Sequence, residues 1–190
     1  MRSFIQFIVY MTIGVALGLG STWYVLESGI SLDAVRVGAW TVRTEAGQPI
    51  ADPYTSAYVA RIGHIPLNIE EAAYFFSNQD DEGKPLDRAC TYSLTGPNLQ
   101  SAWWSVSAHL PDGNVIANPA RRYSFTHATL LFDEDETFRL TVSPEAQAGN
   151  WLPTAGTGPF ILILRLHGPA PDYVRAPETT PVPAIERERC

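Results

Sequence analysis

The sequence predicts a mainly β domain, a jelly-roll-like antiparallel β-sandwich with one or two short helices, behind an N-terminal transmembrane helix. Three observations support this prediction. Residues 4–26 contain no charged side chain, whereas several later segments alternate apolar and polar residues as strands do. The 15 prolines and 14 glycines among 190 residues fit the many turns of an all-β domain better than a helical bundle.

The N-terminal segment FIQFIVYMTIGVALGLGSTWYVL is long enough to cross a bilayer. As a helix its residues span about 35 Å, against about 30 Å for the hydrocarbon core. Trp23 and Tyr24 stand at its outer end, where aromatic rings favour the membrane interface. Arg2 precedes the segment and Glu27 follows it, so the positive-inside rule keeps residues 1–3 in the cytoplasm. The sequence therefore predicts a single-pass inner-membrane protein with a periplasmic C-terminal domain.

Two further interpretations of this segment stay open. Gly18-Leu19-Gly20 offers small residues at the spacing of a signal-peptide cleavage site, although the apolar run continues beyond it to Leu26. Either an uncleaved anchor or a signal peptide delivers the domain to the same compartment. Gly14 and Gly18 form the small-residue pattern that lets two membrane helices approach closely, which makes a homodimer through these glycines a candidate.

The net charge limits the class of partner, and the two cysteines raise the question of a disulfide. The net charge of −7 argues against nucleic acid as a partner, since nucleic acid requires a basic surface. The two cysteines, Cys90 and Cys190, are interpreted as a small buried apolar residue and an incidental terminal residue. A periplasmic location permits a disulfide, but two positions alone do not establish one.

The first part of the exported region is predicted to be a connecting segment over residues 27–51, with a strand-like run at 39–42. A helix is predicted next, with Asp52 as its N-cap, Pro53 at its first position and Gly63 as its stop. Residues 72–77 are ambiguous. Asn68 and Glu71 resemble a helical capping box, but the aromatic content of AAYFFS and the turn residues after it favour a strand.

The β pattern is clearest in the second half of the chain. Residues 102–109 alternate as a half-buried strand, and a hairpin is predicted from strand arms at 126–132 and 137–143 around the acidic turn 133–136. Residues 160–164 are apolar throughout, which predicts a strand covered on both faces. The sandwich domain is expected over 52–170. Residues 171–190 are rich in proline and are expected to be a disordered tail.

Several stretches, in order, carry a family resemblance. They are SAWWSV at 101–106, NPARRY at 118–123, NWLP at 150–153, GPF at 158–160 and LRLHGP at 164–169. Over residues 52–171 the sequence resembles the bacterial domain of unknown function numbered 1214. The resemblance implies a jelly-roll-like sandwich and no particular catalytic residues. The family often follows a second domain of unknown function, numbered 1254, and here the predicted membrane anchor stands in its place.

The sequence lacks the motifs of several catalytic classes. It contains no Gly-x-Ser-x-Gly motif and no cysteine near a histidine. Its four histidines, at 64, 109, 127 and 167, form no His-x-His pair, and each is interpreted as structural. The acidic run at 133–136 is interpreted as a solvated turn rather than a cation site. No metal site and no cofactor is predicted.

Polar residues within aromatic sequence form the candidate ligand site. Arg165 falls inside an apolar strand, and a buried guanidinium must be paired or ligand-bound. The other members are Arg121, Arg122, Tyr123, Asn150 and Trp151. If these converge, they suit a carboxylate, phosphate or sugar ligand. In the alternative interpretation, Arg165 pairs with an internal carboxylate such as Asp87 and Asn150 holds its own loop together.

These observations predict a membrane-anchored periplasmic module of the cell envelope that binds a ligand or partner without catalysis. An enzyme acting on envelope carbohydrate or another small periplasmic substrate is one alternative, because β-sandwiches can host carboxylate pairs that a sequence does not reveal. A structural or assembly factor of the envelope is the other, with contacts through Gly14, Gly18 and the proline-rich tail.

Overall fold

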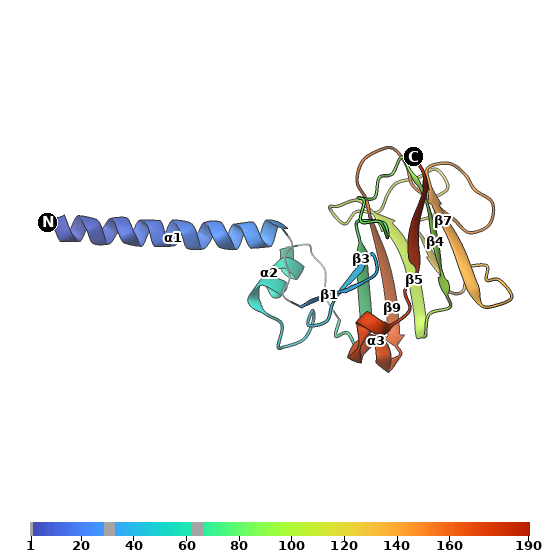
Figure 1. Cartoon of the computed structure of the whole chain (residues 1–190), viewed down its shortest axis with the longest axis horizontal. Coiled ribbons are helices and arrows are strands. Elements are labelled where there is room, and N and C mark those ends of the chain that lie inside the picture. Colours follow the sequence, from blue (N-terminus) through green and yellow to red (C-terminus); the bar gives the residue numbers. More distant parts are fainter. Residues whose placement is uncertain (1, 29–32, 62–66) are drawn as a thin grey trace.

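A long helix begins the computed structural model, which describes residues 2–28, 33–61 and 67–190. Helix α1 (Arg2–Ser28) extends away from the strands (Figure 1). Over Arg2–Leu26 it is long and apolar enough to cross a membrane, and none of that span is buried inside the protein. A Cβ atom added at Gly14 or Gly18 would meet no described atom within 4 Å.

Ten strands of the described residues form two sheets, so the prediction of a mainly β fold is confirmed. The six-stranded sheet has the order β1 (Ala34–Val37), β2 (Trp40–Arg43), β3 (Ala72–Ser77), β9 (Ile161–Pro169), β5 (Ser101–His109), β6 (Ser124–Thr126), and every neighbouring pair is antiparallel. The four-stranded sheet has the order β10 (Ala184–Arg189), β4 (Thr91–Pro97), β7 (Thr137–Ser143), β8 (Trp151–Pro153), with β7 and β8 parallel. The short helices are α2 (Pro53–Arg61), α3 (Pro171–Arg175) and the 3-10 turn η1 (Pro177–Thr179).

The core lies between the two sheets, which gives a sandwich-like arrangement. Strands β3, β9 and β5 form one layer and β4 and β7 the other (Figure 1). Trp104 of β5 packs against Phe138 of β7, with ring centroids 5.2 Å apart. Tyr92 of β4 meets Phe160, just before β9, at 5.7 Å. Burial of these large rings from both sheets contributes to the hydrophobic stabilisation of the fold.

Two local predictions are confirmed by the hydrogen bonds. The Asp52 carboxylate accepts from the backbone N–H groups of Tyr54 and Thr55, as an N-cap does, and α2 begins at Pro53. The predicted stop at Gly63 lies outside the described residues. Residues 72–77 form strand β3, which pairs with β9. Asn68 and Glu71 do not begin a helix: the Glu71 N–H donates to the Asn68 carbonyl and closes a turn just before the strand.

The strand expected to be half-buried is buried on both faces over most of its length. The prediction is correct for the position of β5 and for its inner residues Trp104 and Val106. Ser105, Ser107 and His109, which alternate with them, are also buried. A central strand flanked by β9 and β6 has side-chain neighbours on both faces, so a polar residue there is not necessarily exposed.

The predicted hairpin is wrong. Strand β7 forms as expected, but its partners are β4 and β8, and residues 127–132 form no strand. The chain turns at Thr126, whose carbonyl accepts from the backbone of Thr129 and Leu130. Leu131 then bonds to the side chain of Asn150 instead of to a neighbouring strand. The acidic run 133–136 does form a tight turn, closed by the Asp133 N–H and the Thr137 carbonyl.

Both ends of the region beyond α1 contribute strands to the sheets; the strand-like run at 39–42 is confirmed as β2, whereas the other strands there were not predicted. The expected connection 27–51 supplies β1 and β2, and the expected disordered tail supplies α3, η1 and β10. Ile185 of β10 is fully buried, and its N–H donates to the Asp81 carboxylate. The carbonyl of Pro183 accepts from the Trp40 indole at 2.6 Å. Long-range contacts of this kind leave no local periodicity from which a strand could be predicted.

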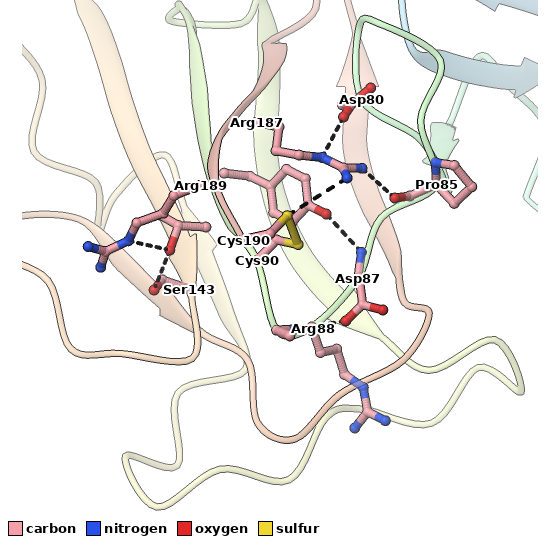
Figure 2. The surroundings of a disulfide bond; sticks show 12 residues. Asp80, Pro85, Asp87, Arg88, Cys90, Ser143, Arg187, Arg189 and Cys190 are labelled. Atoms are coloured by element: carbon pink, nitrogen blue, oxygen red, sulfur yellow. Dashed lines mark hydrogen bonds and ion pairs between the residues drawn. A yellow bond between two sulfur atoms is a disulfide. The ribbon is translucent and has the colours of Figure 1, made fainter.

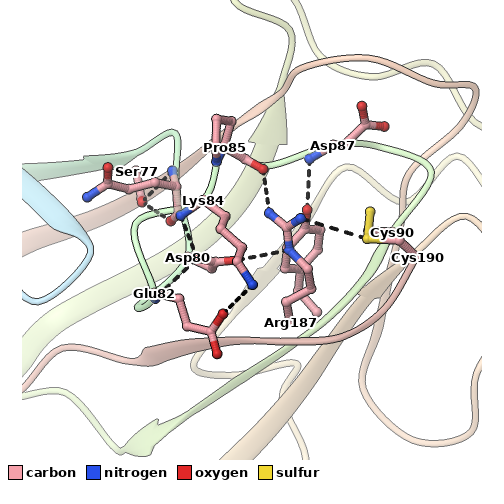
Figure 3. Close-up of polar contacts among 11 residues, drawn as sticks. Ser77, Asp80, Glu82, Lys84, Pro85, Asp87, Cys90, Arg187 and Cys190 are labelled. Atoms are coloured by element: carbon pink, nitrogen blue, oxygen red, sulfur yellow. Dashed lines mark hydrogen bonds and ion pairs between the residues drawn. A yellow bond between two sulfur atoms is a disulfide. The ribbon is translucent and has the colours of Figure 1, made fainter.

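A disulfide joins Cys90 to Cys190, which corrects the interpretation of both cysteines (Figure 2). The two residues are 100 positions apart in the sequence. Beside the disulfide, Arg187 donates to the buried carboxylate of Asp80 at 2.8 Å and to the carbonyl of Pro85, and it lies over the Tyr92 ring (Figure 3). These contacts fasten β10 to the strand β4 that follows Cys90.

Candidate functional site

The outer face of the six-stranded sheet carries a polar group at its centre. Strand β9 lies between β3 and β5, and Arg165 of β9 is in register with Tyr74 on one side and Ser105 on the other. Residues in register on neighbouring strands point to the same face of a sheet. The residues two positions along each strand share this face, which brings Ser107 and His167 beside Arg165.

A chain of hydrogen bonds fixes the orientation of Arg165. Its Nη1 donates to the Ser107 hydroxyl at 2.7 Å. Ser107 lies 2.9 Å from Nε2 of His109, and Nδ1 of His109 lies 2.9 Å from the Gly113 carbonyl. A carbonyl only accepts, so Nδ1 of His109 donates to Gly113, and in the tautomer with the proton on Nδ1 alone Nε2 accepts from Ser107. Ser107 accepts from Arg165, and its own proton is within reach of His109 and, at 3.5 Å, of the Ile163 carbonyl.

The Arg165 guanidinium is half-buried, and burial lowers its pKa, while the nearby Tyr74 acts in the opposite direction. Within the described parts of the chain no carboxylate forms an ion pair with it. Asp87, the carboxylate considered as its partner, instead accepts from the backbone N–H groups of Ala89 and Gly158. Arg165 therefore keeps its positive charge. Its Nη1 donates to Ser107, and none of its donors forms an ion pair with an acidic side chain of the described residues.

Three aromatic rings lie along the same face, next to Arg165. Trp103 of β5 and His167 of β9 are in register, with ring centroids 5.2 Å apart. Tyr74 of β3 meets His167 edge-on at 6.3 Å. Trp103 is 37% exposed, so one large ring on this face remains accessible.

The arginines of the 118–123 stretch lie elsewhere, beside the short edge strand β6. Arg122 donates to the Trp151 carbonyl at 3.1 Å and lies over the Phe125 ring at 5.3 Å. Arg121 is exposed and has a positive φ of 52°, a turn conformation that its neighbours hold through Asn118. Tyr123 is exposed next to it.

Asn150 and Trp151 have structural partners. The Asn150 amide accepts from the Leu131 N–H and donates to the carbonyls of Leu131 and Arg139. The Trp151 indole donates to the Ser143 carbonyl at 3.0 Å. These contacts hold the loop before β8 against β7, as the alternative interpretation of Asn150 expected.

The sequence-predicted residues thus form two groups. The structure brings Arg122 and Trp151 together at the edge of the sandwich, whereas Arg165 lies on the outer sheet face with a different set of neighbours. That any of the six binds a ligand stays a prediction. Ser107 and His109 were missed as members of the site. Their spacing of two residues within a strand places both on one face, and that was the available signal.

Among the described residues, no three or more His, Cys, Asp or Glu side chains lie close enough together to hold a metal ion. In the acidic turn, hydrogen bonds from the Thr137 hydroxyl and backbone lower the pKa of Asp135, so this carboxylate closes its own turn. His64 lies outside the described residues.

Two solved structures are similar to this chain. The VPA0106 protein from Vibrio parahaemolyticus is 26% identical with a TM-score of 0.59, and the match covers 73% of this chain and 36% of that one. An uncharacterised protein from Burkholderia cenocepacia is 20% identical with a TM-score of 0.45, over 62% of this chain and 29% of that one. This chain therefore spans about a third of the length of the Vibrio protein. No protein with a curated description matches it.

A family model confirms the resemblance seen in the sequence. It is described as a protein of unknown function, DUF1214, and it matches residues 71–171. The match includes strands β3, β5 and β9 and with them Arg165, Ser107 and His109, while α1, β1, β2 and β10 lie outside it. Because the model covers more than half of the 190 residues, the chain belongs to the DUF1214 family of proteins of unknown function.

Proposed function

We propose that the protein is a membrane-anchored binding module on the periplasmic side of the inner membrane, and that Arg165 binds a small anionic ligand there. The half-buried guanidinium of Arg165, bonded to a serine hydroxyl and without an acidic partner in the described chain, is the observation that carries the proposal. A charge taken partly out of water without a counterion is costly, and a bound anion removes that cost.

The geometry suits a carboxylate or a phosphate. A guanidinium has five N–H donors in a planar fork, and Ser107 occupies one nitrogen. The chain from Gly113 through His109 to Ser107 holds that nitrogen in place, so less rotamer entropy is lost when an anion binds the others.

The proposed compartment rests on two features. Helix α1 is long and apolar enough to cross a membrane, and its only basic side chain precedes the apolar run. The domain also contains a disulfide, and disulfides persist in the periplasm but are rare in the cytosol.

Anion binding is tested by thermal unfolding of the full chain in detergent, titrated with phosphate, sulfate and acetate. We expect each ligand that binds to raise the Tm of the wild-type protein. At a ligand concentration a hundredfold above Kd, the free energy of unfolding should rise by about 2.7 kcal/mol. Arg165→Ala should abolish the shift, because it removes the cation.

Two other arginines serve as controls in the same titration. Arg139→Ala removes an exposed arginine of the other sheet and should leave the shift unchanged. Arg122→Ala tests the second predicted group at the sandwich edge. A shift that survives Arg165→Ala but not Arg122→Ala would move the site to that edge and refute the assignment to Arg165.

A hydrolase is the second candidate, favoured by the hydrogen bond between Ser107 and His109. A serine hydroxyl within hydrogen-bond reach of a histidine nitrogen is the arrangement of a base-activated nucleophile. Two features favour binding instead: Ser107 is only 3% exposed, and Arg165 already occupies a lone pair of its oxygen. A fluorophosphonate probe separates the two, since covalent labelling that Ser107→Ala abolishes would establish the hydrolase.

A further inference from the structure

The three aromatic rings beside Arg165 add a second recognition element to the face. Trp103, His167 and Tyr74 come from three neighbouring strands, β5, β9 and β3. The His167 ring lies between the other two and contacts both. We call these three residues the aromatic row. Trp103 retains 37% of its exposure, which leaves part of the indole available to a ligand.

The aromatic row lies directly next to the cation. Arg165 and His167 are two residues apart on β9, so their Cα atoms are about 6.6 Å apart along the strand. Tyr74 is in register with Arg165, and Trp103 is in register with His167. A six-membered ring lying over the row can therefore carry an acidic substituent to the guanidinium.

From this juxtaposition we propose that the anion bound at Arg165 is an acidic sugar, with its ring on the aromatic row and its acid group on Arg165. The inference rests on the proposed anion site and adds the class of ligand. The apolar C–H face of a pyranose packs against an indole, while its hydroxyl groups need polar partners around the rim. The Tyr74 hydroxyl and the His167 imidazole provide such partners within the row itself.

The same observations disfavour two simpler ligands. A plain inorganic anion uses Arg165 but gains nothing from an accessible tryptophan. A flat aromatic acid uses Trp103 and Arg165 but leaves the polar atoms of His167 and Tyr74 unpaired, which costs free energy when they lose water. An acidic pyranose uses all four side chains.

The test is isothermal titration of the full chain in detergent with glucuronate, methyl glucoside, acetate and benzoate. We expect glucuronate to bind at least about tenfold more tightly than acetate, because stacking on an aromatic ring contributes about that factor. Trp103→Ala should weaken glucuronate about tenfold and leave acetate unchanged, and Trp103→Phe should restore part of the loss. Arg165→Ala should abolish binding of both acids.

Tyr54→Ala removes an aromatic ring of α2 with a similar exposure of 40%, outside both predicted groups; it is the matched control and should leave both affinities unchanged. If acetate binds through Arg165 but glucuronate binds no tighter, or if Trp103→Ala weakens both acids equally, the sugar inference is overturned and the anion site stands. Tighter binding of benzoate than of glucuronate overturns it in favour of an aromatic acid. If no acid binds, the inference and the proposed function both fail.

Discussion

Asn150 shows how much one buried amide can hold together. It is 7% exposed, and its three hydrogen bonds join the loop at Leu131, strand β7 at Arg139 and the start of β8. All three hydrogen bonds are part-buried. The residue that looked like a ligand donor in the sequence is a structural link between the loop at Leu131 and the paired strands β7 and β8.

We expect Asn150→Ala to lower the free energy of unfolding by about 3 kcal/mol, because it leaves backbone groups of Leu131 and Arg139 without partners. Urea denaturation measures this. Asn114→Ala, in an exposed turn, should cost no more than about 0.5 kcal/mol. Lost anion affinity with unchanged stability would instead return Asn150 to the binding site.

At the scale of elements, β10 depends on contacts distant in sequence. Its Arg187 meets Asp80, whose side chain is 1% exposed against 22% for the arginine. The second oxygen of Asp80 accepts from the backbone N–H groups of Glu82 and Lys84, so the carboxylate is fully used (Figure 3). A buried ion pair of this kind is costly to break on one side only.

Asp80→Asn should therefore destabilise the protein by about 3 kcal/mol, since it leaves the Arg187 guanidinium without its counterion. The nearby pair of Glu82 and Lys84 provides the comparison, because both side chains are more than half exposed. Glu82→Gln should change stability by less than about 1 kcal/mol. Equal effects of the two substitutions in urea denaturation would contradict the structural role assigned to Asp80.

Local patterns account for the elements that were predicted correctly. Helix α2 has its cap and proline, β9 has an unbroken apolar run, and the inner residues of β7 recur with a period of two. Strand β10 has a single fully buried residue, Ile185, among charged neighbours, so its sequence shows no alternation of apolar and polar residues from which a strand could be predicted. The hairpin prediction failed because the partner of β7 is β4, forty residues earlier, and an acidic turn does not specify a partner.

The candidate site was predicted only in part, because its members come from strands that lie far apart in the sequence. Arg165 stands out as a cation in an apolar strand, but its partners Ser107 and His109 come from a strand nearly sixty residues earlier. Only the antiparallel register of β5 with β9 brings them together. Arg122 and Asn150 were grouped with Arg165 because their sequence context is similar, and context does not determine which sheet face a side chain occupies.

At the scale of the whole molecule, the disulfide and α1 are both in keeping with the proposed compartment. Closing a loop of 100 residues stabilises a fold by roughly 4 to 5 kcal/mol in the chain-entropy treatment. That contribution exists only where thiols are oxidised. The anchor and the disulfide are therefore consistent with one another, since an exported domain can keep the bond that fastens β10 (Figure 2).

This consistency predicts the redox state of the protein in cells. When intact bacteria are treated with a thiol-alkylating reagent, the full chain should carry no label at Cys90 or Cys190, because both are oxidised after export. A variant lacking residues 2–28 should stay in the cytosol and carry two labels after denaturation. Two free thiols in the full-length chain would contradict the proposed location.

The central claim, that Arg165 binds an anion on the outer sheet face, is tested most directly by NMR of arginine side chains labelled with nitrogen-15. The Arg165 Nε–H resonance, identified by its loss in Arg165→Lys, should shift saturably as phosphate or glucuronate is added to the full chain in detergent micelles. The Arg139 resonance should not move. Saturable shifts at Arg122 with none at Arg165, or no saturable shift at any arginine, would contradict the claim.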